Sequence, residues 1–275
     1  MTPAVPAARA APGVATAAML AMLSMGLVPT AQAQAFDAVR LYGAAPAKDG
    51  GNVGLALING RKYAGSDEHR TLLLPGLDYV WSNGWFAGTS NGVGYNFSSQ
   101  PFMAYGLRVT ADFGRSESRS RFLKGMGDVD TTAEVGGFLN FSISREFVLT
   151  SSLRYGSGVD RNGLLLDLGA VYSTELAPRW RLGLGAATTY ASADYQQSYF
   201  GVTPRQAITS GYKAYTPGAG LRDLRLNVSL AHGFSQRVGV FAALSAGQLL
   251  GDAKASPLTR AASSVGVVAA VTYSF

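Results

Sequence analysis

The sequence predicts an all-β chain that folds into one antiparallel transmembrane β-barrel of the outer-membrane type. Hydrophobic residues make up 47% of the 275 residues, yet beyond the N-terminus no apolar run reaches the ~20 residues that a membrane-spanning helix needs. Apolar and polar residues instead alternate with a period of two, which places successive side chains on opposite faces of a strand. The 13 tyrosines and 13 phenylalanines recur near the ends of these segments, where outer-membrane barrels place aromatic girdles.

The N-terminal segment is expected to be a secretory signal peptide over residues 1–33. Arg9 precedes the short apolar run 14–28, and Ala31 and Ala33 form a small-residue cleavage site, with a second register after Ala35. The mature barrel would cover residues 34–275. Since Arg9 is the one charged residue removed, the net charge would fall from +6 to +5.

Eleven spans with strand periodicity follow, long enough for the ~9–11 residues that cross a bilayer at a tilt. In chain order they are residues 52–60, 71–82, 84–97, 102–114, 131–144, 147–157, 163–176, 180–194, 221–234, 238–250 and 264–275. Bacterial single-chain barrels use an even number of strands. Residues 36–43 are the best candidate for a twelfth, because splitting the span 84–97 at the hairpin signal Asn91-Gly92 would leave pieces too short to cross. Twelve strands are expected, with ten as the alternative.

The span that begins at Trp180 shows the alternation clearly. Leu182, Leu184 and Tyr190 share one face, which suits lipid, and Arg181 lies on the other, which suits a crowded lumen. The other interpretation, a soluble sandwich with one wet face, is disfavoured by the length of the spans and their aromatic ends.

The last span ends on an aromatic residue. Val271, Tyr273 and Phe275 share the outward face, so Phe275 is expected at the periplasmic edge, facing lipid. By resemblance to other such barrels, Tyr273 and Phe275 form the C-terminal signal that the barrel-assembly machinery reads.

Connections alternate between short and long. Tight turns are expected at residues 98–101, 144–146, 177–179 and 235–237, and longer loops at 115–131, 156–163, 195–220 and 251–262. Outer-membrane barrels have short periplasmic turns and longer extracellular loops, so the alternation orients the chain in the membrane.

The inward face carries charges of both signs. They could line a pore and tune its selectivity, but pairing across neighbouring spans, as with Arg154, Asp167 and Arg181, would cancel the charges and fill the lumen. The second interpretation is favoured, because narrow barrels are more often filled than open. The predicted lumen charges are Arg108, Asp112, Glu134, Arg154, Asp167, Arg181, Asp223 and Arg225.

Catalytic, metal and cofactor sites are not expected. Ser229 and His232 fall on opposite faces of a strand, and His232 is interpreted as an interfacial residue. His69 could pair with a loop carboxylate, but a polar turn explains it equally well. A nucleophile, a base and an orienting group cannot be assembled from these positions, so an enzyme is not predicted. The chain has no cysteine and no metal-ligand spacing.

Basic residues are scattered, without a basic helix or an aromatic-basic motif, so nucleic acid is excluded as a partner despite a pI of 9.6. The densest basic stretch, 115–124, could contact lipopolysaccharide phosphates, although a solvated loop is favoured. Each of three tight turns carries an arginine, Arg145, Arg179 or Arg237. Contact with anionic lipid head groups is favoured over contact with a protein or with murein.

The loop 195–220 contains a predicted short helix. Thr203 can cap it, Pro204 occupies its first position, Gln206 completes a capping box and Gly211 can end it. Such a helix could plug the lumen or project outward as a contact surface.

The same loop carries a family resemblance. Together with residues 249–253, 256–257 and 63–67, it resembles the signature of the MipA/OmpV family. The loop residues that carry the resemblance are Tyr195, Tyr199, Gly201, Thr203, Pro204, Gly211 and Tyr215.

The resemblance implies an outer-membrane protein of a Gram-negative bacterium that acts as a scaffold. It would link a murein lytic transglycosylase to a peptidoglycan synthase, a bifunctional penicillin-binding protein. A channel for solute uptake, suggested by the polar inner face, and a surface adhesin or receptor acting through the long loops are the alternatives.

Overall fold

The computed structural model describes residues 45–275 of the chain. The predicted signal peptide at 1–33 and the predicted strand at 36–43 lie outside the described residues and stay predictions.

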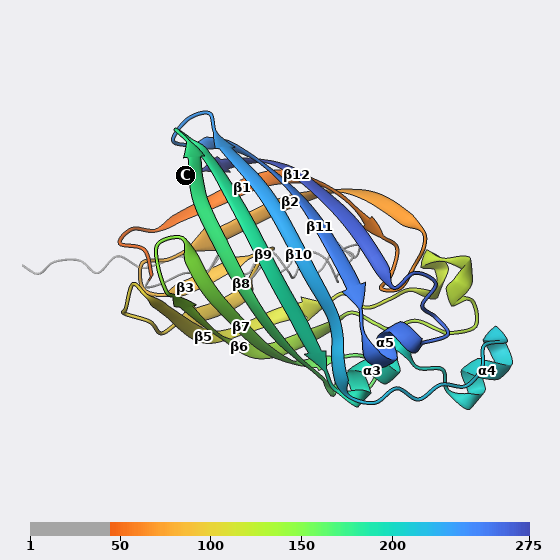
Figure 1. Cartoon of the computed structure of the whole chain (residues 1–275). Coiled ribbons are helices and arrows are strands. Elements are labelled where there is room, and N and C mark those ends of the chain that lie inside the picture. The colour runs from red at the N-terminus through yellow and green to blue at the C-terminus, as the bar shows by residue number, and fades with distance from the viewer. Residues whose placement is uncertain (1–44) are drawn as a thin grey trace, which may run out of the picture.

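The described residues form a closed barrel of antiparallel strands (Figure 1). Every strand pairs with its neighbours in sequence, and β1 pairs with β12 to close the wall, from Asn52 opposite Ser274 to Asn59 opposite Val267. The strands are β1 (Gly50–Arg61), β2 (His69–Val80), β3 (Trp85–Gly88), β4 (Gly92–Asn96), β5 (Met103–Asp112), β6 (Thr132–Ser142), β7 (Phe147–Ser157), β8 (Gly163–Ala177), β9 (Trp180–Ala191), β10 (Gly220–Gly233), β11 (Val238–Leu249) and β12 (Ser263–Ser274). The predicted fold class and the twelve strands are confirmed.

The twelfth strand, however, is not the one predicted from the sequence. The span 84–97 is a hairpin of two short strands, β3 and β4, so the rejection of a turn at Asn91-Gly92 was wrong. Gly92 has a φ of +74°, and a Cβ there would lie 2.1 Å from the carbonyl oxygen of Val109, so this turn requires glycine. Both strands are too short to cross a bilayer, and the hairpin therefore fills only part of the height of the wall.

The short hairpin leaves part of β2 with one neighbour. β3 pairs with β2 only at Asp78, Tyr79 and Val80, so within the described chain residues 69–76 form a ladder with β1 alone. Pro75 lies in this stretch and has no N–H to donate, which suits a strand edge.

The two ends of the barrel differ. One end, called here the short-turn end, carries the connections 81–84, 97–102, 143–146, 178–179 and 234–237. The other, the long-loop end, carries the longer connections and the helices α3 (Ala193–Phe200), α4 (Pro204–Ser210) and α5 (Gly251–Ala255), with short 3-10 turns at Glu117–Arg119 and Arg121–Leu123. No helix among residues 45–275 is long and apolar enough to cross a membrane.

Large apolar side chains cover the outer face of the wall. Leu107, Val135, Leu139 and Phe141 are all exposed there, on the faces that the alternation predicts. Polar and charged side chains lie on the inner face, and the main apolar cluster packs at the long-loop end. The barrel therefore presents an apolar belt outward and places its charges inside.

Candidate functional site

Charged side chains gather inside the barrel towards its long-loop end. Arg154 on β7 lies between two carboxylates, with Nη1 2.8 Å from Glu134 Oε2 on β6 and Nη2 2.8 Å from Asp167 Oδ2 on β8. The side chain of Glu134 is fully buried and that of Arg154 is 3% exposed. A buried ion pair is costly to break, because the remaining partner keeps an uncompensated charge. Arg154 therefore joins three strands from the inside.

The charged cluster continues onto β9 and β10. Arg225 Nη2 lies 3.3 Å from Asp167 Oδ1 and donates to Thr189 Oγ1 at 2.8 Å. Arg222 Nε lies 2.6 Å from Asp223 Oδ2, and Arg225 Nε lies 3.3 Å from Asp223 Oδ1. Polar contacts therefore connect the five adjacent strands β6 to β10 across the inner face.

Arg222 is an inward charge that the sequence does not predict, because it lies at a β-bulge. Strict alternation puts Arg222 on the outer face, which it would share with Leu224, and puts Asp223 on the inner face. The pairing of β10 with β9 shifts between Leu221 and Asp223, so two successive residues, Arg222 and Asp223, are both buried. The signal was the Arg-Asp pair itself, since a buried charge needs a partner.

The remaining predicted lumen charges lie in different places. Arg108 donates from Nη2 to Ser152 Oγ at 2.9 Å, and Asp112 is buried at the end of β5. Arg181 is exposed, lies opposite Glu175, and takes no part in the cluster. It lies eight residues from Thr189 along β9, about 26 Å at ~3.3 Å per residue.

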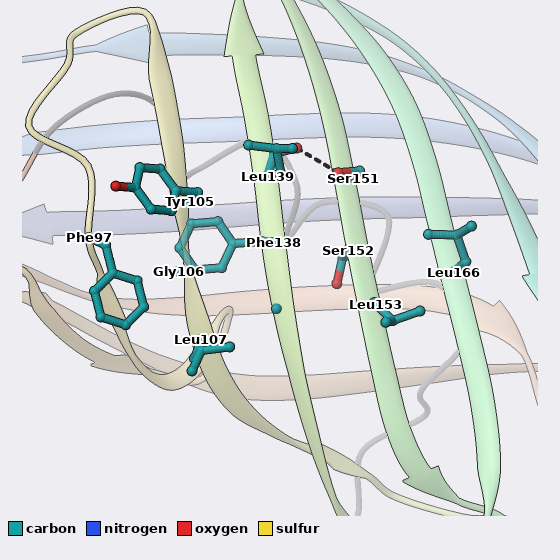
Figure 2. Close-up of a pocket in the computed structure, with 11 residues that line it drawn as sticks. Phe97, Tyr105, Gly106, Leu107, Phe138, Leu139, Ser151, Ser152, Leu153 and Leu166 are labelled. Carbon is teal, nitrogen blue, oxygen red and sulfur yellow. Dashed lines mark hydrogen bonds between the residues drawn. The ribbon is translucent and has the colours of Figure 1, made fainter.

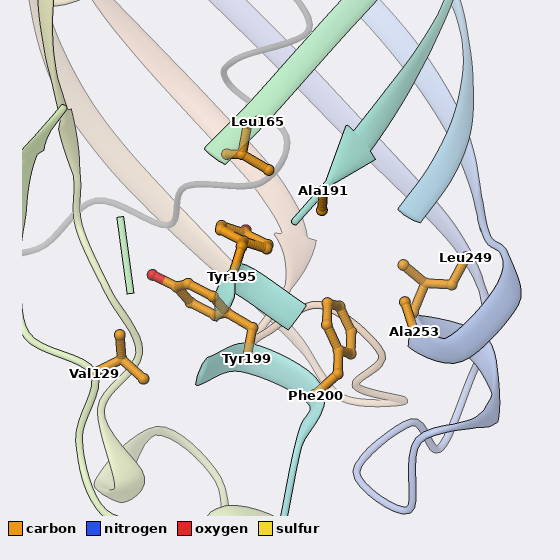
Figure 3. Packing of buried hydrophobic residues seen from close by; sticks show 8 residues of the cluster. All are labelled: Val129, Leu165, Ala191, Tyr195, Tyr199, Phe200, Leu249 and Ala253. Carbon is orange, nitrogen blue, oxygen red and sulfur yellow. The ribbon is translucent and has the colours of Figure 1, made fainter. Parts of the chain in front are cut away.

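Helix α3 crosses the mouth, the opening of the barrel at the long-loop end. The Tyr195 hydroxyl accepts from Arg222 Nη1 on β10 at 2.9 Å, and the Tyr199 hydroxyl donates to Asp112 Oδ2 on β5 at 2.6 Å. β10 and β5 are five steps apart around the twelve strands, so they lie nearly opposite each other. The two tyrosine rings stack with centroids 4.6 Å apart (Figure 3). The helix therefore bridges opposite walls with its two tyrosines.

Apolar packing holds α3 in this position. Its Phe200 is 1% exposed and belongs to a cluster with Leu165 of β8, Ala191 of β9 and Ala253 of α5 (Figure 3). Arg115, from the loop after β5, donates through Nη1 to the Tyr199 carbonyl at 2.8 Å. The helix is thus part of the packed structure of the mouth.

Burial sets the protonation of the groups that hold the helix. It raises the pKa of Tyr195 to about 12, against which the nearby Arg222 acts. It also raises the pKa of Tyr199, reinforced by Tyr195 and by Asp112. Desolvation lowers the pKa of Arg115. Both tyrosines are therefore neutral at physiological pH, Tyr195 as an acceptor from Arg222 and Tyr199 as a donor to Asp112.

Of the two helices in this loop, the sequence predicts one and does not reveal the other. The predicted helix is α4, with the Thr203 and Gln206 capping box present and Gly211 at φ +78°. It projects away from the barrel (Figure 1), and its Ile208 is 86% exposed. The missed helix is α3, whose start was assigned to the strand span 180–194. Ser192 ends that strand by capping α3 through its side chain, a signal visible in the sequence.

The other signature residues brace this loop. Gly201 ends α3 and donates to the carbonyls of Gln196 and Gln197. Val202 and Tyr215 form a bridge of two backbone hydrogen bonds, and the Tyr215 hydroxyl donates to the Asp252 carbonyl at 3.0 Å. Pro204 takes the first position of α4.

The basic stretch 115–124 is packed, which corrects the expectation of a solvated loop. Arg115 is 3% exposed, and Ser120 Oγ donates to Glu68 Oε2 at 2.5 Å. Arg260 from the loop after β11 lies over the Phe122 ring at 3.9 Å and donates to Asp67 at 2.9 Å. Hydrogen bonds from glycine N–H groups and apolar contacts between loops hold this stretch in place. A count of charged residues along the sequence cannot predict such contacts.

The two histidines lie at opposite ends of the barrel wall, His69 at the start of β2 and His232 near the end of β10. The His232 ring lies 4.3 Å from Trp180 and 4.9 Å from Phe234, in an aromatic group at the short-turn end. His69 Nδ1 lies 3.3 Å from Asn59 Oδ1. Over residues 45–275, no group of three or more histidine, aspartate or glutamate side chains is placed to hold a metal ion.

The short-turn end carries aromatic and basic side chains. Tyr273 and Phe275 are exposed on the outer face, and the Phe275 ring lies 6.1 Å from Tyr79. Three exposed arginines of the turns lie at this end, Arg145, Arg179 and Arg237. Arg179 donates to the Phe234 carbonyl at 3.0 Å, and Arg237 donates to the Tyr273 hydroxyl at 3.4 Å.

Comparison with known proteins identifies a family. The model of the family described as MltA-interacting protein MipA matches residues 53–275. No curated protein matches the chain.

Several solved outer-membrane barrels have similar chain courses. A KdgM porin is 11% identical, with 82% of this chain and 99% of that chain covered and a TM-score of 0.42. A NanC porin is 13% identical, with coverages of 80% and 98% and a TM-score of 0.46. An outer membrane channel from Pseudomonas putida F1 is 11% identical, with coverages of 85% and 98% and a TM-score of 0.46.

Proposed function

This chain belongs to the MltA-interacting protein MipA family, and on that premise we propose that it is a scaffold that links a murein lytic transglycosylase to a peptidoglycan synthase. It lies in the outer membrane of a Gram-negative bacterium. The observation that carries the proposal is the extent of the family match, which includes almost the whole barrel and the complete α3 and α4 loop.

The closed mouth supports a role other than passive transport. Tyr195 and Tyr199 tie α3 to opposite walls, and the arginine cluster beneath α3 is paired with carboxylates. An open pore needs a continuous polar passage, which a packed helix and neutralised charges oppose.

The partner surface is assigned to the short-turn end, because murein and its enzymes lie on the periplasmic side. Arg145, Arg179 and Arg237 are exposed there on three separate turns. Their charges would attract acidic patches on a partner and speed its association.

A retention experiment tests the scaffold. The full chain, immobilised in detergent, is exposed to a purified murein transglycosylase of the MltA type and to a bifunctional penicillin-binding protein. Wild type should retain both enzymes, and the triple variant Arg145→Glu, Arg179→Glu, Arg237→Glu should lose them. Arg205→Glu on the exposed α4, at the opposite end, is the matched control and should retain them. Failure of wild type to retain either enzyme would refute the scaffold.

A gated channel is the second candidate, favoured by one observation. The part of the inner wall towards the short-turn end is lined by small and polar residues such as Gly183, Gly185, Asn227 and Ser229, while α3 belongs to a loop and not to the wall. Planar-bilayer recordings should then show low conductance for wild type and higher conductance when residues 193–200 are replaced by a glycine-serine linker. No conductance in either protein would exclude a channel.

A further inference from the structure

The outer wall carries an apolar groove that neither proposed function uses (Figure 2). Its volume is about 520 Å³, and it lies over β5 to β8. The side chains that line it include Phe97, Tyr105, Leu107, Leu139, Leu153 and Leu166.

The groove exists because two outward positions carry little or no side chain. Gly137 on β6 pairs with Leu107 on β5 and with Leu153 on β7, so the two leucines stand on either side of an empty position. A Cβ on Gly137 would lie 3.2 Å from the Gly106 carbonyl oxygen, a tight contact that needs a shift of a few tenths of an ångström. Ser151 on β7, next to Leu139, is the second small residue.

The wall beneath the groove is also altered. The β6 and β7 ladder pairs Phe138 with Ser152 and resumes at Phe141 with Leu149, omitting the two pairs between. Side-chain hydrogen bonds replace the missing backbone pairs. Ser151 Oγ donates to the Leu139 carbonyl at 2.6 Å (Figure 2), and the Ser151 N–H donates to Asn140 Oδ1 at 3.2 Å. The backbone groups stay bonded without a regular ladder, which leaves the strands free to form a depression.

The groove lies in the half of the barrel wall nearer the short-turn end. Gly137 lies six residues from Ile143, where the β6 to β7 turn begins, or about 20 Å at ~3.4 Å per residue. With a strand tilt near ~40° this is about 15 Å along the membrane normal, half of the ~30 Å hydrocarbon core. The lining residue of β6 farthest from the turn therefore lies near the middle of the bilayer, and Phe97 places another side of the groove at the short-turn end.

The short-turn end beside the groove has the residues of a lipid head-group region. Rings of Trp85, Tyr95, Phe97 and Tyr105 follow one another at centroid distances of 5.3, 5.1 and 6.1 Å along the short-turn end. Arg145 is exposed in the turn that joins β6 and β7, the strands on either side of the interrupted ladder. Aromatic rings suit the membrane interface, and an arginine suits a phosphate.

We propose that this groove binds one glycerophospholipid of the periplasmic leaflet, with an acyl chain over Gly137 and Ser151 and the phosphate at Arg145. The groove is continuous with the apolar belt, whose occupant in the membrane is lipid. A chain seated between Leu107 and Leu153 gains contact on two sides, which a flat wall does not offer. The bound lipid would be retained when the surrounding bilayer is removed.

Native mass spectrometry of the full chain in a maltoside detergent, with added phosphatidylglycerol, tests the site. Gly137→Leu and Ser151→Leu fill the groove. Ala269→Leu places the same side chain on the exposed outer face of β12 and is the control. Wild type and Ala269→Leu should retain one phospholipid per barrel. Each groove variant should bind at least roughly tenfold more weakly, since each buried methylene lost costs a factor of about four. Heat-modifiable migration on a gel confirms that each variant folds, and two independent variants protect the test from one that does not.

Equal retention by wild type and both groove variants, or no retention by wild type, would overturn the site. Arg145→Gln should weaken the binding of phosphatidylglycerol and leave the binding of diacylglycerol, which lacks the phosphate, unchanged. If this variant binds phosphatidylglycerol as tightly as wild type does, Arg145 does not hold the phosphate. Competition with purified lipopolysaccharide tests whether the bound lipid comes from the periplasmic leaflet. Displacement of phosphatidylglycerol by lipopolysaccharide would contradict a periplasmic-leaflet ligand.

Discussion

At the scale of single residues, two arginines that alternate onto the same inner face have opposite surroundings. Arg154 lies between the buried Glu134 and Asp167, at 2.8 Å from each. Arg181 is exposed near the short-turn end. Sequence periodicity assigns a face to each side chain, but it does not say how far along the barrel the partner lies.

Replacing Arg154 should therefore destabilise the barrel much more than replacing Arg181. Arg154→Gln leaves the buried Glu134 without its cation and leaves Asp167 with Arg225 alone, and should lower the free energy of unfolding by about 3–5 kcal/mol. Arg181→Gln should change it by no more than about 0.5 kcal/mol. Urea unfolding in detergent micelles measures both. Equal stability of the two variants would mean that the charged cluster is well hydrated.

The tyrosines of α3 predict a loss of stability at alkaline pH. Burial raises the pKa of Tyr195 to about 12, above its usual value near ~10. Because the folded protein favours the neutral phenol, this contribution is complete below pH ~10 and is lost as the pH rises through about 12. Ultraviolet titration of phenolate absorption should show late-titrating tyrosines, one fewer in Tyr195→Phe.

Tyr63, whose pKa burial also raises to about 12, supplies the matched control for that titration. Tyr63→Phe should remove one late-titrating phenol while leaving α3 in the mouth. A titration curve unchanged by Tyr195→Phe would contradict the burial of Tyr195 against Arg222.

At the scale of elements, the two helices of the loop after β9 have different stabilising contacts. α3 packs against β8, β9 and α5 and is tied to opposite walls. α4 contains no buried residue and begins with a full capping box. Local signals therefore determine α4, while α3 depends on tertiary contacts. A surface receptor role for the exposed α4 stays a prediction.

Thr203→Ala should melt α4 without changing the barrel. Loss of the cap removes two hydrogen bonds and lowers the stability of the helix by about 1 kcal/mol. A helix of seven residues is only marginally stable, so this loss should unfold it. Amide hydrogen exchange should rise over residues 204–210 and stay unchanged in α3 and the strands. Thr209→Ala, within the same helix but not at its cap, is the comparison. Equal protection of residues 204–210 in Thr203→Ala and wild type would show that the hydrogen bond from Gln206 to the Met126 carbonyl, rather than the cap, holds α4.

At the scale of the whole molecule, closure of the barrel depends on the pairing of its first and last strands. β12 pairs with β1 over eight residue pairs, and Phe275 extends the seam with backbone hydrogen bonds in both directions to Gly51. The Phe275 ring also lies 6.1 Å from Tyr79 on β2. The last residue therefore contributes to the seam as well as to the predicted assembly signal.

Phe275→Ala should lower the fraction of barrel that assembles in cells. The ring is both the predicted assembly signal and a contact across the seam, whereas Phe234→Ala removes an exposed ring at the same end, away from the seam. Heat-modifiable migration of the outer-membrane fraction measures the folded share. The same folded share in both variants would deny Phe275 a special part in assembly.

The sequence alone determined the features that depend on local periodicity. Alternation of period two gave the outward faces of β6, β9, β10 and β12, the aromatic ends and the order of short and long connections, because a strand repeats every two residues whatever it pairs with. The capping box identified α4 for the same reason. The motifs of residues 195–257 pointed to the family that the match over residues 53–275 confirms.

Tertiary structure alone decided what depends on contacts between distant residues. The hydrogen bond of Tyr199 to Asp112 joins positions 87 apart and places α3 across the mouth. The bulge at Arg222 moves a charge from the lipid face to the interior, and the hairpin at Gly92 relies on the nearby Val109 carbonyl. Each of these three features depends on the free energy of burying or pairing a polar group. The partner lies on a distant strand or loop that sequence periodicity cannot locate, so only the folded barrel reveals the contact.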